Sequence, residues 1–316
     1  MGKTTIGVVN MSFIEAFQEI QALITQDLGN RGLTKNIYLE DFRYAIEELY
    51  EASMVMIVTG FCIKETMTGE TDGPLGAASL ANGLLQLDKK VVLITDKYSQ
   101  ELIEACCKSL NIKIPIEVVP FDGSDDFCRH LLEKYQPSHI VALERPGRAM
   151  DGGCYSMDGE DLRDIIPNTD LLLRKVVDKN IVTIAIGDGG NEMGMGKVRS
   201  ILSQCLPEGE KISAITAADY LVIADVSNWG GHAFVAGLSL LASQRLLHNE
   251  EMEERMLGAI VHAGAVDGCT KERTMTVDGL SLETNLLILN GLHTILNKYS
   301  GSKVRENMHY EALQYN

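Results

Sequence analysis

The chain has 316 residues, 45% of them hydrophobic, so it is long and apolar enough to bury a full core, which argues against a disordered protein. Its 44 acidic side chains outnumber the 28 basic ones and give a formal net charge of -16 at pH 7. Such a chain repels polyanions unless its basic residues gather in one patch, and the sequence has no such patch. We therefore expect no binding to nucleic acid.

The cysteines and the first residues bear on the cellular compartment. The seven cysteines include no C-x-x-C pair, and the chain starts without the basic segment and apolar stretch of a secretion signal. No later run reaches the roughly 18 consecutive apolar residues that a membrane-spanning helix needs. We therefore expect reduced thiols in a cytoplasmic protein that does not enter a membrane.

Two opening helices are predicted at residues 12–29 and 39–52, because apolar side chains recur there at helical spacing. Short apolar runs rich in Val and Ile follow, each with the length of a strand that is buried on both faces. These predicted strands are residues 54–58, 91–95, 116–119, 139–143, 182–186 and 221–224. Segments of helical length lie between the strands. These predicted helices are residues 74–87, 98–110, 124–135, 160–178 and 192–204.

The alternation of strands and helices predicts an α/β fold of the Rossmann-like, doubly wound kind, with a mainly parallel sheet, helices on both faces and extra helices at both ends. We expect one domain over residues 1–316. It would consist of N-terminal helices (1–52), a parallel-sheet core (53–228) and a mostly helical C-terminal part (229–316). The apolar residues 234–247 fit either the core or a subunit face, which leaves a homodimer open.

The first candidate site segment follows the strand at 54–58. In an open parallel sheet, ligands bind beyond the carboxyl ends of the strands. Thr59 and Gly60 occupy that position here, and Glu70 and Asp72 precede Pro74, which fits the first turn of the next helix. The free N–H groups of that helix can then face the crevice and bind an anion. The alternative interpretation is that Glu70 and Asp72 only cap the helix.

The second candidate segment follows the strand at 139–143 and contains Glu144, Arg145 and Arg148. Two guanidinium groups beside a glycine turn can clamp a substrate carboxylate in bidentate fashion. The alternative is that the two arginines form structural ion pairs with Glu144 and Asp151.

The third candidate segment follows the strand at 182–186 and is rich in glycine. It contains Asp188, Gly189, Gly190, Asn191 and Glu192. Backbone N–H groups beside two carboxylates suit proton transfer or a hard cation better than a dinucleotide, because the carboxylates would oppose a pyrophosphate. The alternative is a tight strand-to-helix turn that Asn191 caps.

Two weaker candidates are His232 and Asp267. His232 can act as an acid or a base near neutral pH, or it can simply cap a helix. Asp267 precedes a glycine, as does Asp278, and such pairs commonly form turns. Cys62 is most simply a small buried residue, since no paired base is evident.

Several of these segments together resemble the D-glutamate cyclase C-terminal domain family, from roughly residue 50 to 298. The matching segments are Thr59-Gly60-Phe61, Gly69 to Pro74, Glu144 to Ala149, Gly187 to Glu192 with Gly194 to Gly196, Val266-Asp267-Gly268 and Val277-Asp278-Gly279. The resemblance implies a hydro-lyase that converts D-glutamate to 5-oxo-D-proline. Longer vertebrate mitochondrial members carry a further N-terminal region, which we expect this chain to lack. The family pattern has Asn and a basic residue where this chain has Ser156 and Asp158.

A mechanism can be formulated on these residues. Attack of the amine on the side-chain carboxyl is intramolecular, so the site mainly has to fold the substrate upon itself. The predicted catalytic residues are Glu70 or Asp188, which would take the ammonium proton, and Asp72 or Glu192, which would protonate the departing oxygen. The predicted substrate-binding residues are Thr59, Gly60, Glu144, Arg145, Arg148, Gly189, Gly190, Asn191, His232 and Asp267. In this scheme the arginines hold the α-carboxylate, and the N–H groups of Gly189 and Gly190 stabilise the oxyanion.

Three other functions remain open from the sequence. One is a metal-dependent enzyme that acts on a small phosphorylated or acidic metabolite and binds Mg²⁺ or Ca²⁺ through the carboxylates. Another is a non-catalytic protein that binds an acidic amino acid, and the third is a related amide-forming or dehydrating enzyme. We expect a small acidic substrate and no organic cofactor, with a divalent metal ion left open.

Overall fold

The central element of the fold is one parallel sheet. The computed structural model describes residues 11–29, 32–37, 39–174 and 180–314. Six strands pair in the order β5-β4-β1-β6-β7-β8, and every neighbouring pair is parallel. The strands are β1 (Met54–Thr59), β4 (Lys90–Thr95), β5 (Ile116–Val118), β6 (His139–Leu143), β7 (Val182–Gly187) and β8 (Tyr220–Ile223).

The strand order identifies the position of the ligand crevice. The chain starts the sheet at β1, moves outward through β4 and β5, and then returns to the other side of β1 with β6, β7 and β8. This is the Rossmann order, in which ligands bind at the carboxyl ends of the two central strands where the direction of travel reverses. The predicted α/β fold is confirmed, and the crevice lies beyond β1 and β6.

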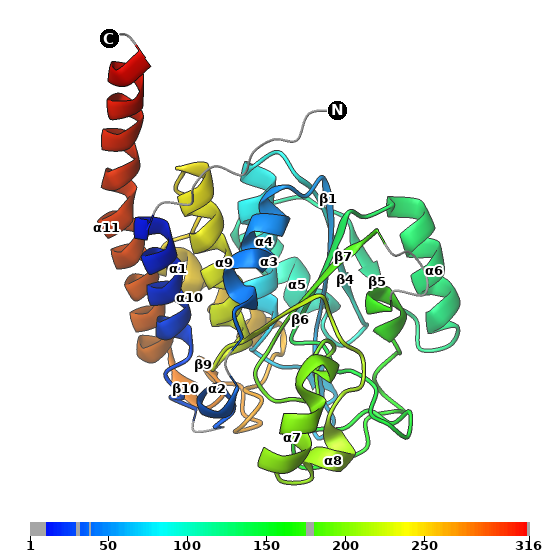
Figure 1. The fold of residues 1–316 in the computed structure, drawn as a ribbon. Coiled ribbons are helices and arrows are strands. Elements are labelled where there is room, and N and C mark those ends of the chain that lie inside the picture. Colours follow the sequence, from blue (N-terminus) through cyan, green and yellow to red (C-terminus); the bar gives the residue numbers. More distant parts are fainter. Residues whose placement is uncertain (1–10, 30–31, 38, 175–179, 315–316) are drawn as a thin grey trace.

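Helices cover both faces of the sheet, as Figure 1 shows for α1, α9, α10 and α11 on one side and α6 on the other. The α-helices are α1 (Met11–Ile24), α2 (Leu33–Asn36), α3 (Asp41–Tyr50), α4 (Pro74–Gln86), α5 (Gln100–Ser109), α6 (Ser124–Tyr135), α7 (Arg199–Cys205), α8 (Gly209–Ile212), α9 (Ser227–Ala242), α10 (Glu250–Ala263) and α11 (Leu282–Gln314). Among the described residues, no helix is both long and apolar enough to span a bilayer.

Short elements complete the fold. Two 3-10 helices are η1 (Asp170–Leu173) and η2 (Gly196–Val198), and two small hairpins are β2 (Cys62–Ile63) with β3 (Thr68–Gly69) and β9 (Thr276–Val277) with β10 (Leu280–Ser281). The β2–β3 hairpin precedes the segment with Glu70 and Asp72, and the β9–β10 hairpin follows the loop with Asp267.

The sheet separates two hydrophobic cores. Alternate side chains of β1 point to opposite faces, so Val55 and Ile57 join the core under α4, α5 and α9, whereas Met56 and Val58 join the core under α6 and α7. Burial on both faces explains why the strands read as continuous apolar runs.

Two predicted helices differ from the structure. Over 160–174, the chain forms a loop that ends in η1, because Pro167 cannot continue a helix and the N–H of Leu162 bonds to the carbonyl of Cys154. The rest of that predicted helix, residues 175–178, lies outside the described residues. The helix predicted at 192–204 begins late, since the N–H groups of Met193 and Gly194 bond to the carbonyls of Arg145 and Thr216.

Candidate active site

A cavity of about 330 Å³ lies at the carboxyl ends of β6 and β7, beside the reversal of the strand order. The residues that line it come from all three candidate segments, from the loop that contains Ser156, from the loop between α10 and β9 (residues 264–275, the late loop) and from the turn after β9. They are Phe61, Ile63, Glu70, Glu144, Ser156, Met157, Asp158, Asp188, Gly189, Asn191, Gly268, Cys269, Lys271 and Asp278. Its size is at the lower end of the range typical of small-molecule sites. The structure thus brings Glu70, Glu144 and Asp188 to one cavity.

Glu144 occupies an unusual backbone position directly after β6. Its φ of 45° lies in the left-handed region, which residues other than glycine rarely adopt and which is often found at functional sites. The side chain is buried, and the Ser227 hydroxyl donates to its Oε2 at 2.6 Å. Burial, followed by the nearby carboxylates of Glu192, Asp72 and Glu70, raises the pKa of Glu144 well above its usual value. A protonated carboxylic acid therefore fits this position.

Asp72 caps a helix, but not the one that the sequence suggested. Its two carboxylate oxygens accept hydrogen bonds from the N–H groups of Ser227 (2.8 Å), Asn228 (2.7 Å) and Gly73 (2.9 Å). Asp72 therefore holds the first turn of α9, whereas the start of α4 is capped by Oδ1 of Asn228, which accepts from the N–H groups of Gly73 (2.9 Å) and Gly76 (2.8 Å). The carboxylate does not line the cavity, although it lies close to those of Glu144 and Asp188.

Glu192 shapes the glycine-rich turn after β7. Its carboxylate accepts hydrogen bonds from the N–H groups of Asp188 (2.9 Å), Gly189 (2.6 Å) and Gly190 (2.6 Å). The N–H groups of Gly189 and Gly190 are therefore engaged by protein, which disagrees with the prediction that they stabilise an oxyanion. Asn191 lines the cavity, and its amide donates to the carbonyl of Tyr155 at 2.7 Å.

The late loop forms one wall of the cavity through a close approach to Glu70. A Cβ atom at Gly268 would lie 1.9 Å from Oε2 of Glu70, so any larger residue there would displace the Glu70 carboxylate from its position. Asp267, which does not line the cavity, organises this loop by accepting from the N–H groups of Cys269, Thr270 and Gly279. Burial opposes ionisation of Asp267, but the hydrogen bonds prevail and lower its pKa.

Arg145 does not act as the predicted clamp. It is fully buried, and it donates to Asp96, to the hydroxyl of Thr169 and to the carbonyls of Gly60 and Pro167. Its guanidinium therefore has no contact with the cavity, and its ion-pair partner is Asp96 rather than the predicted Glu144. Arg148 also lies outside the cavity lining, with its guanidinium donating to the carbonyl of Ile166.

Three further predicted residues lie apart from the cavity lining. Thr59 is fully buried at the end of β1, and Gly60 connects two loops, because its N–H donates to the carbonyl of Glu144 at 3.2 Å. His232 is buried inside α9, where its Nε2 lies 3.5 Å from a carboxylate oxygen of Glu253.

Lys271 is the basic residue among those that line the cavity, and the sequence analysis did not select it. Its Nζ donates to the carbonyl of Gly268 at 2.5 Å, and its backbone has a left-handed φ of 63°. The available sequence signal was its position three residues after the matching family segment Val266-Asp267-Gly268. The cavity therefore combines several carboxyl groups with one ammonium group.

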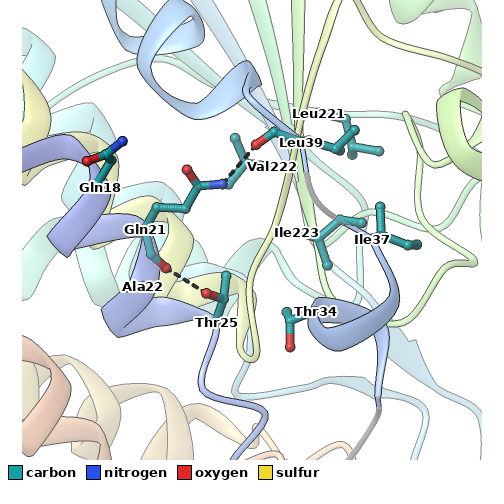
Figure 2. A pocket seen from close by; sticks show the side chains of 10 residues that line it. All are labelled: Gln18, Gln21, Ala22, Thr25, Thr34, Ile37, Leu39, Leu221, Val222 and Ile223. Carbon is teal, nitrogen blue, oxygen red and sulfur yellow. Dashed lines mark hydrogen bonds between the residues drawn. The ribbon is translucent and has the colours of Figure 1, made fainter. Parts of the chain in front are cut away.

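A second cavity, of about 340 Å³, lies between α1, α2 and the edge strand β8 (Figure 2). Its polar residues are Gln18, Gln21, Thr25 and Thr34, and the other lining residues are aliphatic. Some of the polar groups are used within the protein, since the Gln21 amide donates to the carbonyl of Leu39 at 2.9 Å (Figure 2). Among the residues that the structure describes, no titratable side chain lines this cavity, so those residues are less suited to acid–base chemistry than the carboxyl-rich lining of the first cavity.

The fold and the cavity together define a class: an α/β protein of Rossmann strand order, with a carboxyl-rich ligand site at the reversal of its sheet. Residues 20–293 match the family described as D-glutamate cyclase-like, C-terminal, and the chain belongs to that family. The chain is also 30% identical over 310 residues to the human protein D-glutamate cyclase, mitochondrial. That alignment covers 86% of this chain and 50% of the human protein, so the chain spans about half the length of that relative.

The comparisons confirm the resemblance found in the sequence. The cytoplasmic location, the homodimer and the absence of nucleic-acid binding stay predictions, and the human relative is named as mitochondrial.

Proposed function

We propose that this chain is a D-glutamate cyclase-like hydro-lyase that converts D-glutamate to 5-oxo-D-proline and water. The family match and the name of the human relative support the reaction class. The observation that carries the proposal is the cavity itself, where the protonation-prone Glu144 lies with Glu70 and Asp188. Carboxyl groups in different environments can serve as acid and base in one site.

The reaction sets clear requirements for these groups. The N–C bond of the lactam forms as one C–O bond of the side-chain carboxyl breaks, and two protons move from the ammonium nitrogen to the departing oxygen. A base must therefore accept a proton from the ammonium group, and an acid must deliver one to the oxygen that leaves as water. Each group then acts a second time: after the attack, the protonated base gives its proton to the departing oxygen and the ionised acid accepts the second proton from nitrogen, so both groups regain their starting protonation states.

The residues fit these requirements as follows. Glu70 or Asp188 accepts the ammonium proton, and Glu144 is the acid. Glu144 takes this role in place of the predicted Asp72 and Glu192, because backbone N–H groups engage the carboxylates of those two residues. Lys271 replaces the arginine pair as the partner of the substrate α-carboxylate. Phe61 and Ile63 supply the apolar part of the wall, which favours the folded, less hydrated substrate.

A second candidate function has its own observation. Ligand oxygens of Asp72, Glu144 and Asp188 all lie within 4.8 Å of one another, and carboxylate oxygens are the ligands that Mg²⁺ and Ca²⁺ prefer. A metal-dependent enzyme that acts on a small phosphorylated or acidic metabolite would use this group. Loss of turnover on chelation, with recovery on adding back the ion, would favour this function.

The test is direct detection of product. The purified chain is incubated separately with D-glutamate and L-glutamate, and 5-oxoproline is measured by mass spectrometry. We expect product from D-glutamate, and a loss of roughly 100-fold or more in the variants Glu70→Gln or Asp188→Asn. Glu65→Gln, an exposed residue in the turn before Glu70, is the matched control and should keep full activity.

Two results would contradict the proposal. Absence of product from both enantiomers, at protein concentrations that allow slow turnover to be seen, would remove the cyclase function. Thermal stabilisation by D-glutamate without product would instead indicate a non-catalytic binding protein for acidic amino acids.

A further inference from the structure

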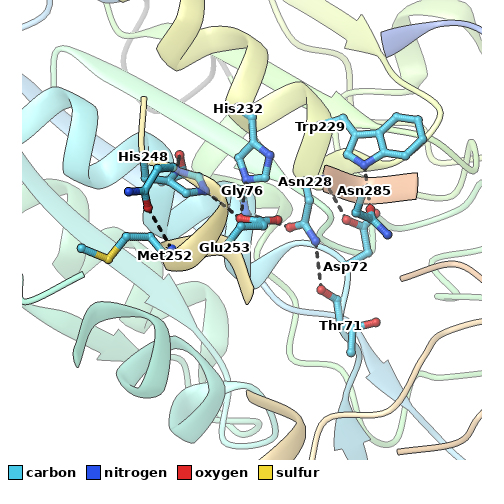
Figure 3. Close-up of polar contacts among 12 residues, drawn as sticks. Thr71, Asp72, Gly76, Asn228, Trp229, His232, His248, Met252, Glu253 and Asn285 are labelled. Carbon is cyan, nitrogen blue, oxygen red and sulfur yellow. Dashed lines mark hydrogen bonds and ion pairs between the residues drawn. The ribbon is translucent and has the colours of Figure 1, made fainter. Parts of the chain in front are cut away.

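Away from the cavity, three titratable side chains converge in the protein interior (Figure 3). His232 belongs to α9, His248 to the loop after it, and Glu253 to α10. Their exposed fractions are 2%, 7% and 3%, and they line neither of the two cavities described above. The sequence predicted substrate binding by His232, but the proposed function uses none of these three side chains, which we call the His-His-Glu cluster.

Both imidazoles direct a nitrogen toward the same carboxylate oxygen. Oε2 of Glu253 lies 2.7 Å from Nε2 of His248 and 3.5 Å from Nε2 of His232. The two rings meet edge to face, with their centroids 5.0 Å apart. One ligand atom from each residue therefore falls within 4.8 Å of the others.

The environment of His232 is unusual for a buried side chain. Within the described part of the chain, its Nε2 is buried and has no hydrogen-bond partner, and a buried polar atom left in this way carries a free-energy cost. This nitrogen is directed at the centre of the cluster, 3.5 Å from a carboxylate oxygen of Glu253, which is the position that a metal-binding nitrogen would occupy.

We propose that His232, His248 and Glu253 bind a zinc ion. Two imidazole nitrogens and one carboxylate oxygen form a donor set that Zn²⁺ uses in proteins, and three protein ligands leave a fourth position for water. Bonds of about 2.0–2.2 Å in a tetrahedron place ligand atoms about 3.4 Å apart. The 3.5 Å separation already matches, and the 2.7 Å separation requires a small rotation of Glu253 away from His248.

A fourth residue orients one of the ligands. Nδ1 of His248 lies 3.0 Å from the hydroxyl of Ser79, which belongs to α4 and is buried. When Nδ1 donates its proton to that hydroxyl, Nε2 presents its lone pair to the metal, which is the usual way in which a second layer of residues fixes a zinc-binding histidine. The same burial keeps substrates away from Ser79, which argues against a hydrolytic Ser-His-Glu triad.

The zinc ion would join three parts of the fold. Ser79, His232 and Glu253 belong to α4, α9 and α10 respectively, and α9 begins at Ser227, whose hydroxyl holds Glu144. An ion that fixes α9 against α4 and α10 therefore also fixes Ser227, and through it the side chain of Glu144, without touching the substrate. The role is structural, and zinc binding is independent of which reaction the cavity catalyses.

The first test is zinc binding by the full chain after treatment with a chelator. Isothermal titration calorimetry should give one Zn²⁺ per chain, and the midpoint of thermal unfolding should rise with zinc concentration. We expect Glu253→Gln and His232→Asn to abolish this binding, and Ser79→Ala to weaken it by roughly 10- to 100-fold. His130→Asn, at an exposed histidine, is the matched control and should bind zinc as the unchanged chain does.

The second test needs no variant, so it remains decisive if a substitution prevents folding. Crystals of the unchanged chain are soaked in Zn²⁺, and anomalous scattering is measured at the zinc absorption edge. A peak between His232, His248 and Glu253 supports the proposal. Zinc found only at the carboxyl groups of the cavity or at the exposed cysteines, or no zinc at saturating concentration, overturns it.

Discussion

Two pairs of buried carboxyl groups lie close together in this protein, and their surroundings differ. The carboxylates of Asp72 and Glu192 each accept three backbone N–H groups. Glu144 and Asp188 are similarly buried, but they line the cavity. Burial alone therefore does not distinguish a structural carboxylate from one that can perform chemistry, whereas a position in the cavity lining does.

The difference has a simple physical basis. A carboxylate that accepts several N–H groups is stabilised in its charged form and fixed in position, so it is a poor proton donor. A carboxyl group held among other carboxylates and away from water is stabilised in its neutral form, as Glu144 is. The predictions below test whether the two pairs differ as this account requires.

The largest effect is expected at Glu144. The substitution Glu144→Gln removes the proposed acid and keeps the shape of the side chain, so turnover of D-glutamate should fall by about 100- to 10,000-fold. Product formation followed by mass spectrometry measures this, and the unfolding midpoint serves as the folding control. A variant that retains more than a tenth of the activity would show that Glu144 is not the acid.

The next effect is a loss of stability at Glu192. Glu192→Ala leaves the N–H groups of Asp188, Gly189 and Gly190 without their acceptor, so the free energy of unfolding should fall by about 3 kcal/mol. Urea denaturation followed by circular dichroism gives this quantity. Glu208→Ala, at an exposed residue, is the control and should change stability by less than about 0.5 kcal/mol. If Glu192→Ala changed the free energy of unfolding as little as Glu208→Ala does, the structural role of Glu192 would be contradicted.

A pH dependence of stability should also separate the pairs. The pKa of Glu144 in the folded chain is raised above 4.5, so above that pH the folded chain keeps a proton that the unfolded chain has released. The contribution of this group is complete below its unfolded pKa and is lost as the pH rises through the folded pKa. The free energy of unfolding, measured by urea denaturation across a pH series, should therefore decline less steeply with rising pH in Glu144→Gln than in the unchanged chain. Parallel curves for the two proteins would exclude the raised pKa.

The smallest effect concerns ligand protection of a thiol. Cys269 is exposed and lines the cavity, whereas Cys205 is exposed elsewhere. D-Glutamate should slow the alkylation of Cys269 by iodoacetamide several-fold and leave that of Cys205 unchanged, as measured by peptide mass spectrometry. Cys62 should stay unmodified, because burial raises the pKa of its thiol to about 12. Equal rates at Cys269 with and without D-glutamate would place the ligand elsewhere.

Much of the fold could be predicted because its signals are local. The strands around Val55, Ile140 and Ile184 appear as apolar runs of the right length, and the helix at 124–135 has clear helical spacing. The rule that ligands bind beyond the carboxyl ends of parallel strands is sufficient to place Glu70, Glu144 and Asp188 at the ligand site from the sequence alone.

The roles within the site could not be predicted, because they depend on contacts between distant residues. Nothing near Arg145 in the sequence indicates that Asp96 is its partner, and the helix that Asp72 caps begins far downstream at Ser227. Lys271 was missed for the same reason, since its loop reaches the cavity only through the packing of the C-terminal part. Structural and reactive carboxylates in this chain have the same residue types and the same neighbouring glycines, so these sequence features do not separate them.

The close approach of Gly268 to Glu70 has a consequence for the timing of site formation. A chain emerging from the ribosome can complete all six strands of the sheet before residue 268 is synthesised, since β8 ends at Ile223. One wall of the cavity is then still missing, and with it Lys271. Nascent chains of this protein should therefore acquire a stable sheet before they acquire the ability to retain a ligand.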